Sequence, residues 1–197
     1  VLNDSVSAAD GKERDYTQLI SFLKTAGASL GSKEFGGTAL TQSIQHSLPI
    51  LALRGNFDYV ESWVPTSDGK EFVESDYIVS PQYGDKIQSY LSENQGKMVS
   101  NSKNTSLGKV WLSKKPLFLP QITPDDLFGR FHSAQALGFT SVSIIPILHD
   151  DKVMGFFKGY NIKAPAGATE SSPQFLDELA TFSSRLVQAG FYGTSRL

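Results

Sequence analysis

Two apolar segments joined by a short polar turn constrain the fold of this chain more than any other feature. The segments extend from about Ser141 to Leu148 and from Lys152 to Tyr160, and the turn between them is His149-Asp150-Asp151. Each segment has the length of a β-strand, and the polar turn matches a hairpin connection. We therefore predict two antiparallel strands that lie side by side.

A second hairpin is predicted nearer the N-terminus. Between residues 57 and 64, Phe57, Tyr59, Glu61 and Trp63 alternate with a second set, so each set occupies one face of a strand. The turn that follows has Asp-Gly at its centre, which is typical of a hairpin. The other expected elements are strands at 72–79 and 116–119, helices at 16–30, 38–51, 86–93 and 173–186, a helical segment at 125–139, and a polar loop at 94–106.

Length and composition limit the class of protein. With 197 residues and 40% hydrophobic content, the chain suits a single domain, which we place at residues 16–197 after a tail or linker at residues 1–15. The formal charge is 18 minus 20, or −2, which argues against nucleic-acid binding, and no apolar run is long enough to span a membrane. The absence of Cys fits an intracellular, cytoplasmic protein. Because the chain begins with Val, we expect a piece of a longer protein.

The stretch from Leu107 to Tyr160 also resembles the core of a GAF domain, a small-molecule-sensing module. The positions that carry the resemblance are Gly108, Trp111, Pro120, Gly138, Pro146 and Gly155. The resemblance covers roughly residues 38–190. It implies an α/β (α+β) fold with a central antiparallel sheet of five or six strands, helices on one face and ligand-covering segments on the other. It implies no particular ligand, because one fold hosts many functions.

A ligand pocket is expected on the resemblance and on the residue pattern. Residues 127–137 carry apolar side chains three and four positions apart, and two serines share one face of the next strand, so a mixed apolar and polar pocket fits. The candidate ligand-binding residues are Trp63, Phe118, Phe128, Arg130, Phe131, His132, Ser141 and Ser143. Arg130 would pair with an anionic ligand. The alternative is that the aromatic residues pack in the core, the serines face water, and Arg130 and His132 are exposed.

The sequence contains no recognisable catalytic constellation, so we expect no enzyme. Its three histidines lack metal-ligand spacing, and the motifs of serine hydrolases, P-loop proteins and dinucleotide-binding proteins are absent. Without Cys, the chain cannot attach a bilin covalently, nor reduce methionine sulfoxide as one cysteine-dependent group of GAF-fold enzymes does. A non-covalent chromophore beside His132 and a cyclic nucleotide stay open as ligands. The Asn-Lys-x-x-Phe-Asp motif of cyclic-nucleotide-binding GAF domains is not matched.

The resemblance implies a non-catalytic sensory or regulatory domain that binds a small molecule and signals to a neighbouring output domain or partner subunit. The alternative is a protein-interaction or dimerisation module whose pocket is filled and which has no ligand. The last helix carries Phe175, Leu179, Phe182 and Leu186 at near-heptad spacing, which suits a homodimer formed through the terminal helices. The same stripe suits packing on the domain's own sheet equally well.

Overall fold

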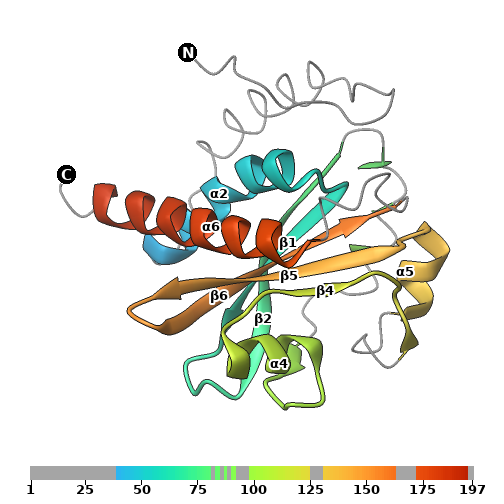
Figure 1. Cartoon of the computed structure of the whole chain (residues 1–197), viewed down its shortest axis with the longest axis horizontal. Helices are drawn as coiled ribbons and strands as arrows, with labels where there is room; N and C mark the ends of the chain where they lie inside the picture. Colours follow the sequence, from blue (N-terminus) through green and yellow to red (C-terminus); the bar gives the residue numbers. More distant parts are fainter. Residues whose placement is uncertain are drawn as a thin grey trace.

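The computed structural model describes residues 39–80, 83–84, 87, 90–91, 98–124, 131–162 and 172–194, and the structural statements below refer to them. They form a six-stranded antiparallel sheet with helices against both of its faces (Figure 1). The elements in chain order are α2 (Ala39–Gly55), β1 (Tyr59–Pro65), β2 (Glu71–Val79), β3 (Met98–Ser100), α4 (Ser106–Ser113), β4 (Leu117–Leu119), α5 (Phe131–Leu137), β5 (Ser141–His149), β6 (Lys152–Asn161) and α6 (Pro173–Thr194). The strand order is β3-β2-β1-β6-β5-β4, which confirms the predicted α+β fold.

Both predicted hairpins are present, and they meet in the middle of the sheet because β1 pairs with β6. At the tip of the β5–β6 hairpin, Asp150 and Asp151 have positive φ values of 47° and 59°. Two successive left-handed residues match the twist of the flanking strands, and Asp tolerates this conformation better than most side chains. The predicted alternation is confirmed from Tyr59 onward, because Tyr59 and Trp63 lie in one core cluster and Val60 lies in the other. It is wrong for Phe57, which precedes β1 and packs in the cluster of Val60.

Helices α2 and α6 lie side by side against one face of the sheet (Figure 1). On α2, Ile44, Leu48 and Leu51 have the spacing of one helical face and are at most 2% exposed, whereas Leu40 on the same face is half-buried. Helix α6 adds Leu179 and Val187 to the same cluster. The sheet contributes Val60, Ile145, Ile147 and Phe157. We refer to this side of the sheet as the helix face.

Side-chain hydrogen bonds fasten α6 at a contact that is otherwise apolar. The backbone nitrogen of Leu148 donates to Ser184 Oγ at 2.9 Å, and Gln188 Nε2 donates to the oxygen of Leu148 at 2.8 Å. Leu148 adjoins a β-bulge in the pairing of β5 with β6. A bulge leaves backbone groups outside the ladder, and here side chains of α6 satisfy them. Helix α6 is therefore fixed to one point on β5.

The near-heptad stripe on α6, which was predicted to suit a homodimer, packs largely within the chain. Leu179 is 1% exposed, whereas Phe175, Phe182 and Leu186 are half-buried. Phe175 and Phe182 pack against the same cluster as Leu179. The homodimer through this helix stays a prediction. Although α6 has 22 residues, no helix in the described ranges is long and apolar enough to cross a membrane.

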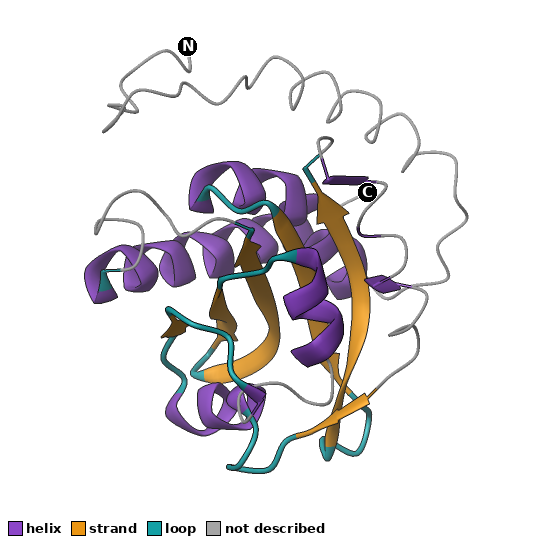
Figure 2. Ribbon diagram, turned by 90° about the vertical axis from the view of Figure 1, so that its right-hand side faces the viewer, coloured by secondary structure: helices purple, strands orange, loops and turns teal. Residues whose placement is uncertain are grey.

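The sheet is curled (Figure 2). Its face opposite α2 and α6 carries the larger core cluster, which is rich in aromatic side chains. Helix α4 contributes Leu107 and Val110 to this cluster, and α5 contributes Ala134. The aromatic members include Tyr59, Trp63, Phe72, Tyr90, Phe139, Phe156 and Tyr160. We refer to this side as the aromatic face, and the candidate site lies on it.

Four elements differ from the sequence prediction. Helix α4 was not expected, and α6 continues to Thr194, beyond its expected end at residue 186. The loop expected at 94–106 contains strand β3, which pairs with residues 71–73 at one edge of the sheet. Only the central residue of β3, Val99, is buried, so the strand is too short for its alternation to be detected. Helix α2 continues beyond its expected end at residue 51, with Pro49 inside it. The helices expected at 16–30 and 86–93 lie wholly or largely outside the described residues.

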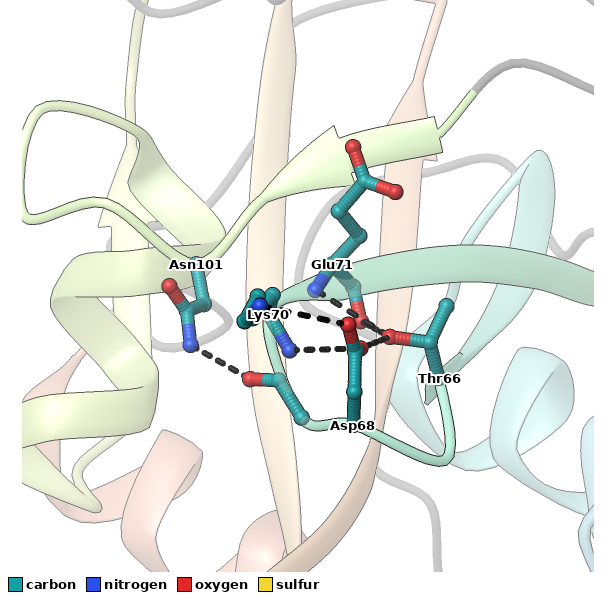
Figure 3. A network of polar contacts seen from close by, with 6 residues as sticks. Thr66, Asp68, Lys70, Glu71 and Asn101 are labelled. Atoms are coloured by element: carbon teal, nitrogen blue, oxygen red, sulfur yellow. Dashed lines mark hydrogen bonds and ion pairs between the residues drawn. The ribbon is translucent and has the colours of Figure 1, made fainter.

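A polar network ties the tip of the β1–β2 hairpin to the loop that precedes α4 (Figure 3). Asp68 Oδ1 accepts hydrogen bonds from Thr66 Oγ1 at 2.7 Å and from the nitrogen of Lys70 at 3.1 Å, which closes the turn. Asn101 Nδ2 donates to the oxygen of Gly69 at 2.5 Å, and its backbone nitrogen donates to the oxygen of Lys70 at 3.0 Å. The hairpin tip therefore fixes the start of the α4 loop.

The first turn of α4 requires glycine at position 108. Thr105 Oγ1 accepts a hydrogen bond from the nitrogen of Gly108 at 3.0 Å and so caps the helix. A Cβ atom on Gly108 would lie 1.9 Å from the backbone oxygen of Ser102. The loop can pass this close to α4 only because residue 108 has no side chain.

We expect Gly108→Ala to lower the free energy of unfolding by about 1–3 kcal/mol, because the backbone must move away from the added methyl group. The matched control is Lys109→Ala at the exposed neighbouring position, which should change stability by less than about 0.5 kcal/mol. Urea denaturation of both variants measures the difference. Equal stabilities would contradict the close approach of the loop to α4.

Candidate functional site

A buried ion pair lies in the middle of the aromatic face. Glu61 on β1 and Lys158 on β6 are direct cross-strand neighbours, and both residues are 0% exposed. The Nζ atom of Lys158 is 3.1 Å from Oε1 of Glu61. The register of the two central strands therefore places opposite charges together inside the core.

Three aromatic side chains donate hydrogen bonds to the same carboxylate. Trp63 Nε1 and Tyr160 Oη donate to Oε1 of Glu61, at 2.8 and 2.9 Å. Tyr59 Oη donates to Oε2 at 3.0 Å. The ammonium of Lys158 lies beside Oε1 as well, so two neutral donors and one positive charge converge on Oε1, while Tyr59 donates to Oε2.

Aromatic rings surround the ion pair. The Nζ atom of Lys158 lies 5.5 Å from the ring centroid of Trp63 and 5.1 Å from that of Tyr160, distances at which a ring face attracts a cation. The ring of Phe139 stacks on Tyr160 with centroids 4.9 Å apart, and on Tyr59 with centroids 5.8 Å apart. Phe139 therefore packs against both tyrosines that donate to Glu61.

The surroundings keep Tyr59 protonated. Burial raises the pKa of Tyr59 well above its ordinary value, and the negative charge of Glu61 raises this pKa further. A phenol with a raised pKa retains its proton at every physiological pH. The hydroxyl of Tyr59 therefore stays a hydrogen-bond donor throughout that range.

The ion pair is not explained by stability. Taking two charges out of water costs several kcal/mol per ion, and apolar residues of similar volume often stabilise a core at least as well. Proteins depart from simple core packing most often at functional sites. We therefore take Glu61, Lys158, Tyr59, Trp63 and Tyr160 as the candidate functional site, and refer to them below as the polar cluster.

The structure brings one of the residues predicted from the sequence, Trp63, into the polar cluster. Ser141 and Ser143 lie on the helix face, because they alternate along β5 in phase with Ile145, which packs against α2 and α6. Phe118 is half-buried and is the register partner of Ser143, so it belongs to the helix face too. The expectation that these four residues line one cavity is corrected: the sheet separates Trp63 from the other three.

The alternative, in which the two serines face water, is wrong as well. Ser141 is 1% exposed and Ser143 is 2% exposed. The Oγ atom of Ser141 has no hydrogen-bond partner among the described residues.

The remaining predicted residues lie at or beyond the edge of what the structure describes. His132 is exposed on α5. Phe128 and Arg130 lie outside the described residues, as does the side chain of Phe131. Their participation in ligand binding stays a prediction.

Sequence reasoning missed four members of the polar cluster: Tyr59, Glu61, Lys158 and Tyr160. A signal was present, because Glu61 falls between two large aromatic residues on one face of a predicted strand. A charged residue in such a position indicates a buried charge that needs a partner. The sequence alone did not reveal that partner, because the register between β1 and β6 decides that Glu61 faces Lys158.

A separate, open depression lies on the outer side of α2 and α6. It is lined by Arg54, Gln174, Asp177, Glu178, Thr181, Phe182 and Arg185. The guanidinium of Arg54 lies 4.2 Å from the ring centroid of Phe182. Two basic and two acidic side chains balance each other here, and we assign this depression no ligand.

Comparison with known proteins establishes the family. The model of the GAF domain family matches residues 44–186, which is most of the chain. The chain therefore belongs to the GAF domain family, as the resemblance predicted. This family is known for small-molecule sensing and regulation. A search of curated proteins found no match.

Solved structures share the fold at low sequence identity. The GAF domain of a phosphoenolpyruvate-protein phosphotransferase from Coxiella burnetii is 15% identical with a TM-score of 0.53, over 93% of this chain and 100% of that one. The second GAF domain of DevS from Mycobacterium smegmatis is 13% identical with a TM-score of 0.55, over 80% and 96%. The free methionine-R-sulfoxide reductase of Neisseria meningitidis, solved with its substrate, is 10% identical with a TM-score of 0.54, over 95% and 98%. At these identities the likeness shows the fold alone.

We expect Lys158→Met to lower the free energy of unfolding by about 3–5 kcal/mol, because it leaves the charge of Glu61 buried without a counter-ion. Lys152→Met is the matched control, since Lys152 is exposed on the same strand, and it should cost less than about 0.5 kcal/mol. Chemical denaturation followed by tryptophan fluorescence measures both. If Lys158→Met cost less than about 1 kcal/mol, the ionised pair would not exist in the folded core.

Proposed function

We propose that the chain is a non-catalytic regulatory GAF domain that binds a small molecule at the polar cluster and signals its occupancy to a neighbouring domain or partner subunit. One observation carries the proposal. A buried ion pair, held by three aromatic donors, occupies the centre of the sheet face that α2 and α6 leave free.

The composition of the aromatic face supports ligand binding. Small-molecule sites are mostly apolar and aromatic, with a few polar groups that fix the orientation of the ligand. The polar cluster has this composition, with aromatic rings around a single ion pair. Membership of the GAF family supports the regulatory role, because sensing and regulation are the functions for which the family is known.

The strands offer a route from the polar cluster to α6. On β6, Lys158 lies on the aromatic face, while the adjacent Phe157 packs in the cluster on the helix face. Strand β5 pairs with β6 and is fastened to α6 through Leu148. A ligand that moves Lys158 therefore acts on α6 through two neighbouring strands.

A protein-interaction module without a ligand is the second candidate. The observation that favours it is the closure of the aromatic face, since Glu61 and Lys158 are both 0% exposed. Helix α6, with Phe182 half-buried at its outer side, then provides the contact surface for a second copy.

Equilibrium dialysis of the purified chain against a mixture of small metabolites, followed by mass spectrometry of the retained compounds, tests the proposal. We expect retention of one class of compound, recovered unchanged, that shifts the NMR signals of residues 59–63 and 156–160. Chemical conversion of the compound would refute the non-catalytic role. No retention, together with a dimer in sedimentation experiments, would favour the second candidate.

Two tryptophan variants provide a matched pair for this test. Trp63→Phe removes a donor to Glu61, whereas Trp111→Phe makes the same change at a half-buried residue that packs on Phe72 and Phe156. We expect Trp63→Phe to weaken binding of the retained compound by about tenfold, the effect of one lost hydrogen bond in a buried network. Trp111→Phe should leave the affinity nearly unchanged. The same loss in both variants would show that binding does not involve the polar cluster.

A further inference from the structure

We propose that residues 16–30 of this chain dock as a helix on the outer side of α2 and α6. They cover an apolar seam formed by Ile50, Phe182 and Leu186, which we refer to as the outer seam. This docking is independent of ligand binding at the polar cluster, because the outer seam lies on the other side of the sheet.

Helices α2 and α6 make close contact near the start of α2. Ser43 Oγ donates a hydrogen bond to the backbone oxygen of Val187 at 2.5 Å, and Ser43 and Ser47 are 4% and 2% exposed. Ile50 continues the same line along α2 at helical spacing, yet it is 42% exposed. The contact between the two helices is therefore closed beside Ser43 and open beside Ile50.

Helix α6 presents apolar side chains at the same opening. Arg54, one turn beyond Ile50 on α2, places its guanidinium 4.2 Å from the ring centroid of Phe182. Phe182 and Leu186 are one turn apart on α6, and both are half-buried. Three partly exposed apolar side chains thus meet where the two helices separate, and a third apolar stripe suits this position.

A covering segment from the same chain suits the outer seam better than a second copy does. Two of its three side chains are already half-buried, so it exposes far less surface than a stable dimer buries. The depression beside it carries the charged side chains of Arg54, Asp177, Glu178 and Arg185. A tethered segment avoids the entropic cost of bringing two molecules together, so a small apolar contact is sufficient to hold it.

The 38 residues of the sequence that precede α2 contain such a stripe. Within residues 16–30, apolar side chains recur at helical spacing, and most of the other positions are polar or small. The stripe consists of Leu19, Phe22, Leu23, Ala26 and Leu30. The sequence therefore predicts an amphipathic helix that needs an apolar surface to cover its stripe.

The lengths of the segments match the position of the opening. As a helix, residues 16–30 measure about 22 Å, and residues 31–38, which include three glycines, allow the chain to reverse its direction. Ile50 lies 11 positions after Ala39, which is about 17 Å along α2. A helix that runs back along α2 therefore brings the first half of the stripe, Leu19 to Leu23, to Ile50.

Docking connects the N-terminal segment to the sheet. Helix α6 is fastened to β5 through Leu148, and the docked segment contacts α6 through Phe182 and Leu186. A displacement of α6 is then passed on to residues 16–30. The same segment covers the side of α6 that a second copy would otherwise contact.

A spin label tests the docking, and the chain suits this method because it contains no Cys. The full chain carries one nitroxide at Lys24→Cys, outside the predicted stripe, and isotope-labelled isoleucine methyl groups. We expect the methyl NMR signal of Ile50 to lose most of its intensity. The signal of Ile144, on the aromatic face, should keep most of its intensity and serves as the internal reference.

Two further variants of the labelled chain form a matched pair. Leu23→Glu places a charge in the stripe and should restore the Ile50 signal, because docking would bury that charge without a partner. Ser21→Glu places the same charge on the opposite side of the predicted helix and should leave the loss of signal intact. Equal loss in both variants would overturn the docking of this stripe, as would an Ile50 signal that the nitroxide never weakens.

A mixed sample separates a segment of the same chain from a second copy. Spin-labelled chains without isotope are mixed with isotope-labelled chains that carry no nitroxide, and the Ile50 signal should then keep its intensity. Loss of the Ile50 signal in the mixture would overturn the proposal, since it would show that another copy covers the outer seam. None of these results bears on binding at the polar cluster, which the dialysis experiment tests separately.

Discussion

The ion pair between Glu61 and Lys158 sets the conditions for the rest of this structure. Two buried charges of opposite sign tolerate no slip in register between β1 and β6, because a shift by one residue would send one charge to the helix face. The three aromatic donors to Glu61 come from the same two strands. The pairing of the central strands, the orientation of the aromatic rings and the polarity of the site thus depend on one contact.

The two faces of the sheet differ in composition. The helix face is mostly apolar, with buried serines such as Ser141 and Ser143 and the hydrogen bonds from α6 to Leu148, and it stabilises the fold. The aromatic face combines large rings with a buried ion pair that stability does not explain. This division is consistent with a family that keeps one scaffold and binds different ligands on it.

The sequence predicted the fold well because the fold follows from local patterns. The alternation of Tyr59, Glu61 and Trp63, the Asp-Gly turn and the β5–β6 hairpin were all visible in residues close together along the chain. Strand β3 was missed because only Val99 of its three residues is buried.

The candidate site was predicted poorly because it depends on contacts between distant residues. Ser141 and Ser143 were assigned to a pocket from their spacing, yet spacing does not tell which face of the sheet a set of residues occupies. Glu61 and Lys158 are far apart in the sequence, and only strand register shows that they meet. One member of the polar cluster, Trp63, was predicted because it is a large aromatic residue on a predicted strand.

The most direct test of this account is the stability of the doubly neutral variant, Glu61→Gln with Lys158→Met, in equilibrium denaturation. If the ion pair is retained for binding, the free energy of unfolding of this variant should lie within about 1 kcal/mol of the original chain, because the desolvation cost disappears together with the attraction. A loss of about 3 kcal/mol or more would contradict the account, since it would show that the ion pair is there to hold the fold together.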